Sequence, residues 1–85
     1  MDVAQKVCKI ISDVTGIDLE KITPQTTFYL DLNMDQLDMT ELVMEVEDEL
    51  LTSIVPDDKI EDLLGKTVAD LVRLVEGMMQ QDREM

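Results

Sequence analysis

The stretch DQLDMTELVMEVEDELL, residues 35–51, decides the fold, because it combines a helix start with a helical repeat of apolar residues. Asp35 can cap a first turn, and Asp38 stands three residues later, at the second position of a capping box. The spacing therefore predicts a helix from Gln36 to Leu51. At about 100° per residue, one group of apolar side chains falls within about 60° of Met39, as in a core-facing stripe. This stripe consists of Met39, Leu42, Val43, Val46 and Leu50.

The same helix carries a second apolar stripe, roughly 100° to 160° around the axis from the first. Its members are Leu37, Thr40, Met44 and Leu51. Acidic residues border it, with Glu47 on one side and Glu41 and Asp48 on the other. One helix of a small bundle rarely buries two faces, so we expect this stripe to be at least partly exposed. An apolar strip rimmed by charge is typical of a docking surface for proteins. The alternative is that Leu37 and Met44 pack under a neighbouring loop.

Three further helices are predicted from spacing of the same kind. An amphipathic helix runs from about Asp2 to Thr15 and stops at Gly16. A short helix is expected over residues 57–64, ended by a glycine, and a last helix opens at Thr67 with Asp70 three residues on. The inward-facing residues of the last two helices are expected to be Ile60, Leu63, Leu64, Val68, Leu71, Val72, Val75 and Met79.

Residues 17–35 are expected to form a long irregular loop, because Pro24, Thr26, Thr27 and Asn33 oppose a helix. The apolar residues expected to anchor this loop in the core are Ile17, Leu19, Ile22, Phe28, Leu30 and Leu32. No segment alternates as a strand would. The predicted fold class is therefore all-α, a small bundle of three main helices plus one short helix. We expect one domain over residues 1–85, with a polar tail that frays from about Gln80.

The charge of the chain is strongly negative, since 20 acidic and 7 basic residues give a formal net charge of -13. Such a field repels phosphate backbones, so we expect no nucleic acid binding, and it disfavours anionic membranes. Proteins with basic patches would be attracted. The alternative is that the acidity serves solubility alone. No apolar run approaches the roughly 20 residues of a membrane span, and no signal peptide is visible. We expect a cytoplasmic monomer, and residence in an organelle after removal of a transit peptide stays open.

Catalysis and metal binding have little support in the sequence. There is no His to act as a base, no Gly-rich phosphate loop and no Ser in a nucleophile motif, so no enzyme is predicted. Cys8, the single cysteine, cannot form an internal disulfide or supply a common zinc site. Residues 31–35 have the spacing of the first calcium-loop ligands. Gln36 and Leu42 then stand where that loop needs Gly and Glu, so we expect no such site.

Residues 31–44, DLNMDQLDMTELVM, resemble the signature of acyl carrier proteins, which reads Asp-Leu-Gly-x-Asp-Ser-Leu-Asp and continues into Glu-Leu-Val-Met. The resemblance is close to members of type II fatty acid synthesis and covers most of the chain. It includes the pair Thr27 and Phe28, the turn at residues 54–56, and the pair Thr67 and Val68. It implies a small helical bundle with an expandable apolar interior. It also implies a carrier that holds acyl chains as thioesters on a 4′-phosphopantetheine arm while enzymes dock on the second helix.

One departure from the family pattern bears on mechanism. The family attaches its arm to the serine of the Asp-Ser-Leu motif, and that position is Gln36 here. Attachment needs a hydroxyl oxygen to attack the pyrophosphate of coenzyme A, and a carboxamide has no such nucleophile. Ser12 and Ser53 do not match the motif. We therefore expect that the chain does not take the arm. A milder departure is Asn33 for the family Gly, since Asn tolerates left-handed backbone better than most residues.

Three functional hypotheses remain open. The first is an armless carrier homologue that acts as a scaffold or regulator by docking on basic partners, by resemblance the enzymes of acyl-chain synthesis or transfer. The second is a working acyl carrier of fatty acid or polyketide biosynthesis whose attachment serine has been replaced at Gln36, in which case the cofactor is 4′-phosphopantetheine. The third is a bundle that binds fatty acids non-covalently in its core. The partner-docking residues expected under the first hypothesis are Asp35, Leu37, Asp38, Thr40, Glu41, Met44, Glu47 and Asp48.

Overall fold

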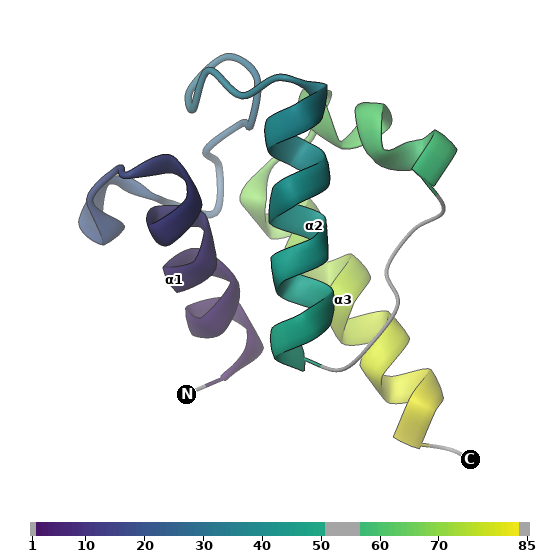
Figure 1. Ribbon diagram of the computed structural model, residues 1–85. Helices are drawn as coiled ribbons and strands as arrows, with labels where there is room; N and C mark the ends of the chain where they lie inside the picture. Colours follow the sequence, from purple (N-terminus) through teal and green to yellow (C-terminus); the bar gives the residue numbers. More distant parts are fainter. Residues whose placement is uncertain (1, 51–56, 84–85) are drawn as a thin grey trace.

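A computed structural model describes the backbone of residues 2–50 and 57–83, and the side chains of residues 2–50 and 60–78 (Figure 1). The elements, in chain order, are α1 (Val3–Thr15), the short 3₁₀ helix η1 (Leu19–Lys21), α2 (Gln36–Leu50), the 3₁₀ helix η2 (Asp57–Gly65) and α3 (Val68–Arg83). Within these residues there is no β-strand, only an isolated bridge between Thr27 and Thr67. The prediction of an all-α bundle with three main helices and a short one is confirmed.

Helix α1 begins and ends as its sequence predicts. The Asp2 carboxylate accepts a hydrogen bond from the Gln5 backbone N–H at 2.8 Å, and the Gln5 side chain accepts one from the Asp2 N–H at 3.3 Å. This reciprocal pair of bonds satisfies two backbone N–H groups at the helix start that have no carbonyl partner within the helix. At the other end, Gly16 adopts left-handed backbone with a φ of 76°. Val7 and Ile11 lie fully buried on the inner face of the helix.

Helix α2 is capped by the predicted pair of acids. The Asp38 N–H donates to Asp35 Oδ1 at 2.9 Å, and the Asp35 N–H donates to Asp38 Oδ2 at 3.2 Å. Just before the cap, Asn33 has a φ of 55°, the left-handed conformation that Asn tolerates. All five residues of the predicted core stripe are buried. The helix start is confirmed, and Leu51, the predicted last residue, lies outside the described residues.

The long loop before α2 is tied by backbone hydrogen bonds to the junction between η2 and α3. The Phe28 N–H donates to the Lys66 carbonyl at 3.3 Å, and the Tyr29 N–H donates to the Leu64 carbonyl at 3.0 Å. In the other direction, the Val68 N–H donates to the Thr26 carbonyl at 2.8 Å. The loop is therefore irregular but held at several points, and Phe28 anchors it with no exposed surface.

Two of the predicted loop anchors are wrong. Ile22, Phe28 and Leu32 are buried and Ile17 is partly buried, but Leu19 is 50% exposed and Leu30 is 80% exposed. Leu30 lies in a tight turn between Phe28 and Leu32. Because the side chains of those two residues occupy the core side of the turn, the Leu30 side chain is directed outward. Leu19 belongs to η1, which packs on α1.

The last two helices follow the prediction with two differences. Short helix η2 has 3₁₀ geometry, which suits a short connector, and it buries Ile60 and Leu63 but only part of Leu64. Helix α3 begins after a capping box in which the Thr67 N–H donates to Asp70 Oδ2 at 3.1 Å. It continues to Arg83, and the expected fraying from about Gln80 stays a prediction. Gln and Arg are good helix formers, and no proline interrupts this stretch.

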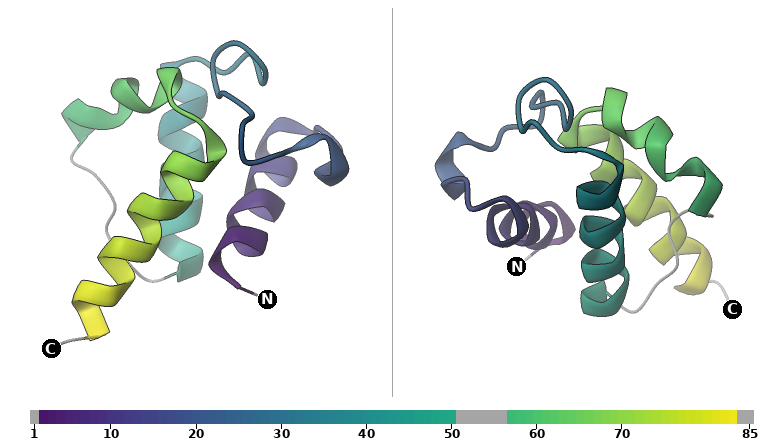
Figure 2. Two further views of the ribbon diagram at one scale, coloured as in Figure 1. Left: turned by 180° about the vertical axis from the view of Figure 1, so that it is seen from behind. Right: turned by 45° about the horizontal axis from the view of Figure 1, so that its top comes forward.

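The helices enclose one core. Helix α1 contacts both α2 and α3, and η2 packs against α2 (Figures 1 and 2). Helix α1 lies between η1 and α2 in both figures, and the loop that enters α2 lies beside its N-terminal end. The largest fully buried side chains are Phe28, Ile11, Met39, Leu42 and Leu71. This packing fixes one side of α2 inside the bundle and leaves the opposite side outside.

Replacing Phe28 with alanine should lower the free energy of unfolding by about 3–5 kcal/mol, because it leaves a cavity under the loop. Urea denaturation followed by circular dichroism measures this change. Tyr29→Ala is the matched control, because Tyr29 is the next residue in the chain and its side chain is 59% exposed. This variant should change the free energy of unfolding by no more than about 0.5 kcal/mol. Equal losses for the two variants would contradict the assignment of Phe28 as the anchor of the loop.

The acid dependence of stability should involve Asp70. The backbone N–H of Thr67 lowers the pKa of the Asp70 carboxyl, with help from the Thr67 hydroxyl and the charge of Arg73. A carboxyl whose pKa is lowered on folding stabilises the protein above its unfolded pKa of about 3.9 and loses that contribution as the pH falls. Asp70→Asn should therefore reduce the fall in melting temperature between neutral pH and about pH 3. A fall as large as that of the wild type would contradict the role of Asp70.

Candidate functional site

The candidate site is built around the first residue of α2, Gln36, which is exposed. The cap formed by Asp35 and Asp38 precedes it, and Met34 anchors the entering chain with a buried side chain. The Met34 N–H also donates to the Phe28 carbonyl at 3.0 Å. The position is thus presented to solvent at a fixed helix start. The Gln36 side chain ends in a carboxamide, so it offers hydrogen-bond donors and an acceptor but no hydroxyl nucleophile.

Hydroxyl groups near this position in the sequence are engaged elsewhere. The Thr40 hydroxyl donates to the Gln36 carbonyl at 2.9 Å, one helical turn away. The Thr27 hydroxyl donates to the Asp31 carboxylate at 3.1 Å, and the Ser12 hydroxyl, on α1, donates to the Ile17 carbonyl at 2.6 Å. None of these hydroxyls belongs to position 36, where the family pattern has its serine, and the expectation that the chain takes no arm stays a prediction. Ser53 lies outside the described residues.

The second apolar stripe of α2 reaches solvent. Leu37 is 79% exposed and Met44 is 58% exposed, while Thr40 between them is partly buried. The alternative that Leu37 and Met44 pack under the loop is thereby excluded. The two side chains are seven residues, or about two helical turns, apart on the same side of the helix, so they form a ridge roughly 10 Å long. Leu51, the fourth predicted member, lies outside the described residues.

The predicted acidic rim follows this ridge. Asp35, Glu41 and Asp48 are exposed, and Asp38 and Glu47 are partly buried. Asp35 and Asp38 also accept backbone N–H groups of the first turn, where negative charge is favourable. The structure thus brings the eight predicted docking residues onto α2 and its cap. Their role in docking stays a prediction.

Sequence reasoning missed two surface residues close to this site. Tyr29 was not singled out, and Leu30 was predicted to lie in the core, but both are exposed in the turn that leads to α2. A signal was present, because residues 28, 29, 30, 32 and 34 are all apolar and a tight turn cannot direct all of them inward.

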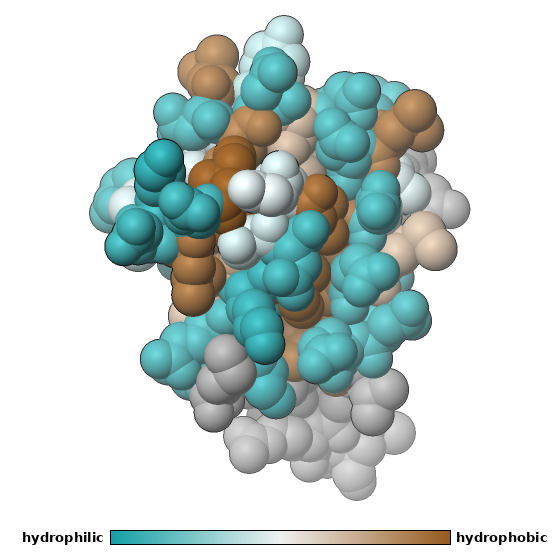
Figure 3. Space-filling view, turned by 60° about the vertical axis from the view of Figure 1, so that its left-hand side comes forward, coloured by the Kyte–Doolittle hydropathy of each residue, from teal (hydrophilic) through white to brown (hydrophobic). Residues whose placement is uncertain are grey.

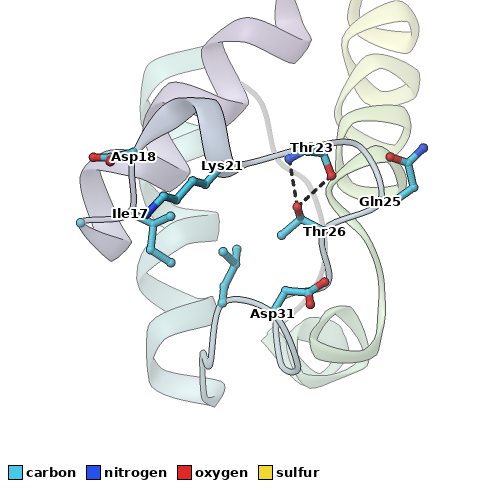
Figure 4. A pocket seen from close by; sticks show the side chains of 9 residues that line it. Ile17, Asp18, Lys21, Thr23, Gln25, Thr26 and Asp31 are labelled. Atoms are coloured by element: carbon cyan, nitrogen blue, oxygen red, sulfur yellow. Dashed lines mark hydrogen bonds between the residues drawn. The ribbon is translucent and has the colours of Figure 1, made fainter.

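A polar hollow lies between η1 and the loop that leads to α2. Figure 4 shows Ile17, Lys21 and Asp31 around it. Its threonines bond to one another, since the Thr23 N–H donates to Thr26 Oγ1 at 2.9 Å and the two hydroxyl oxygens are 3.0 Å apart. These bonds stabilise the loop, and no buried side-chain nitrogen or oxygen of the described residues lacks a hydrogen-bond partner.

The surface on the α1 side is mixed in character. In Figure 3, hydrophobic side chains reach the surface at several places, with pale and hydrophilic residues between them. Burial raises the pKa of the Cys8 thiol, and the charge of Asp2 raises it further, so the thiolate is disfavoured.

Over residues 2–50 and 57–83, no cluster of acids or cysteines suited to a metal ion is found. Over the same residues, no helix has the length and hydropathy that crossing a bilayer requires.

Comparison with known proteins places the chain in a family. Residues 5–75 match the family described as "Phosphopantetheine attachment site". The chain is 43% identical over 75 residues to the acyl carrier protein of Sinorhizobium fredii (strain NBRC 101917 / NGR234). It is also 43% identical over 75 residues to the acyl carrier protein AcpP of Rhizobium meliloti (strain 1021). Each match covers 88% of this chain and 92% of the relative.

The matched region runs from α1 through most of α3 and contains the start of α2, where the family motif lies. The family match and the sequence identity both indicate an acyl carrier protein, and the all-α architecture is consistent with that family. The chain therefore belongs to the acyl carrier protein family, whose members are carriers and not enzymes.

Proposed function

We propose that this chain is an armless member of the acyl carrier protein family that acts as a docking domain, bringing proteins with basic patches to a scaffold or regulating them. The observation that carries the proposal is Gln36. It stands exposed at the start of α2, at the position where the family pattern has its serine. An apolar ridge with acidic borders begins at the next residue, Leu37. The residues of the site thus support the docking of a partner protein, but they do not support attachment of a 4′-phosphopantetheine arm.

The 4′-phosphopantetheine arm of the family does not fit the residues of this site. A phosphodiester to the arm requires an alcohol oxygen that attacks the pyrophosphate of coenzyme A and expels the adenosine phosphate portion. The Gln36 side chain ends in an amide whose nitrogen lone pair is delocalised into the carbonyl, so it cannot take that part. The Thr40 hydroxyl lies a turn further along α2, where it donates to the helix backbone.

The docking proposal rests on the exposed side of α2. Leu37 and Met44 present a leucine and an unbranched thioether, and the flexible thioether can adapt its shape to the surface of a partner. Residues 35–50 hold seven acids and no Lys or Arg. A basic partner would therefore be steered to this side and would bind faster at low salt. An acidic partner would be repelled.

A second candidate is favoured by the residues around Gln36. Asp35, Leu37 and Asp38 keep the family pattern on both sides of the substituted position, and the helix start keeps its cap. The chain is then a working acyl carrier whose serine has been replaced at this one position. The two candidates differ in their prediction for a serine at position 36. Only under the second candidate is that serine expected to restore attachment of the arm.

Incubation with coenzyme A and a carrier-protein transferase tests the attachment. The wild-type chain should show no increase in intact mass, because it has no motif hydroxyl. Gln36→Ser is the informative variant, with Gln36→Ala as the matched control that should stay unmodified. A gain of one arm by Gln36→Ser would favour the second candidate, and its failure would favour a site that has also lost transferase recognition. A mass increase of the wild-type chain would overturn the armless proposal.

Charge reversal tests the docking surface. Glu41→Lys with Asp48→Lys reverses two exposed acids beside the ridge, and should weaken binding of a purified basic partner by at least about tenfold at low salt. Glu45→Lys with Glu49→Lys is the matched control, because it makes the same charge change on the same helix, further around from Leu37 and Met44. Titration calorimetry measures the affinities, and circular dichroism confirms that helicity is kept. Equal weakening by both pairs would indicate net charge alone and contradict a specific surface.

A further inference from the structure

Two large apolar side chains project from the loop beside α2 and have no role in the core. Tyr29 is 59% exposed and Leu30 is 80% exposed, although their neighbours Phe28 and Leu32 are buried. Single exposed apolar residues are ordinary on protein surfaces. Here two are consecutive, and the turn that carries them lies beside the N-terminal end of α2, next to the start of the proposed docking surface (Figures 1 and 2).

The turn that presents these side chains is held in place by its backbone. The Tyr29 N–H donates to the Leu64 carbonyl at 3.0 Å, and the Asp31 and Leu32 N–H groups each donate to the Thr27 carbonyl at 3.2 Å. The Asp31 carboxylate closes the turn by accepting the Thr27 N–H at 2.7 Å. Because folding has already ordered the turn, a partner that covers Tyr29 and Leu30 does not have to order it again.

The charge of the surroundings selects the kind of partner. Between Ile22 and Leu50 the chain has eight acids and no Lys or Arg. A second copy of the chain would bring the same negative surface against this one, and an anionic lipid surface would be repelled in the same way. A protein whose basic patch adjoins an apolar pocket satisfies both the acids and the two side chains.

We infer that Tyr29 and Leu30 form a second contact of the docking surface, entering an apolar pocket of the same basic protein that covers Leu37 and Met44 of α2. This inference rests on the proposed docking function and adds to it a loop contact that is apolar and independent of salt. The acids of α2 then govern the rate and salt dependence of binding, while the loop pair slows dissociation.

Photocrosslinking tests whether one partner covers both places. p-Benzoylphenylalanine is introduced in the full chain at Tyr29, at Met44 or, as a control, at Asp13, which is exposed on α1. The expected result is that positions 29 and 44 yield adducts of the same partner, identified by mass spectrometry, and position 13 does not. Adducts of that partner at 44 without any at 29 would overturn the loop contact and leave the docking proposal standing. No partner adduct at 44 would overturn the docking proposal and this inference with it.

The purified partner then allows the contact to be measured. Tyr29→Ser with Leu30→Ser should weaken its binding by about ten- to a hundredfold, with the same dependence on salt as the wild type. Leu19→Ser is the matched control, an equally apolar side chain that is 50% exposed in η1, beyond α1 from the docking surface. It should leave the affinity unchanged. Unchanged affinity of the double variant, with its melting temperature kept, would overturn the inference.

Discussion

The start of α2 depends on hydrogen bonds exchanged between the preceding loop and the beginning of α3. The first N–H groups of a helix have no partner within it. In α3, the Val68 and Ala69 N–H groups donate to the carbonyls of Thr26 and Pro24. A few residues further along, the loop donates its own N–H groups, from Phe28 and Tyr29, to Lys66 and Leu64. The loop therefore caps one helix while it delivers the chain to another, and burial of Phe28 beneath it makes the arrangement hard to displace.

This arrangement explains how α2 can line the core on one side and present apolar residues to solvent on the other. One side is fixed inside the bundle by five buried apolar residues, so the opposite side is directed outward. The outward side keeps an apolar ridge, since Leu37 and Met44 stay exposed among the described residues. Under the proposed function, the acids along that side would favour a basic partner. This outward surface is formed by side chains of α2 itself. It therefore does not depend on which residue stands at position 36 or on whether an arm is attached there.

The family assignment and the chemistry of position 36 therefore bear on different questions. Relatives named acyl carrier protein share the fold and most of the chain with this protein. Attachment of an arm depends on one oxygen atom at one position, and a chain can keep the fold of a carrier without it. Under the proposed function, a chain without the arm would act through its docking surface alone.

The sequence by itself determined the helices, their caps and the core stripe of α2, because these depend on residues three or four apart. Asp35 with Asp38, and Thr67 with Asp70, bond as their spacing predicts. The family was also visible there, as was Gln36 at the position where the family pattern has its serine. Only the tertiary structure decided which apolar residues of the loop are buried. Phe28 and Leu30 are similar in hydropathy, but backbone bonds to residues distant in sequence turn the first inward and the second outward. Such long-range contacts leave no periodic pattern in the chain. The run of apolar residues over positions 28–34 therefore indicates that some of them are exposed, but not that these are Tyr29 and Leu30.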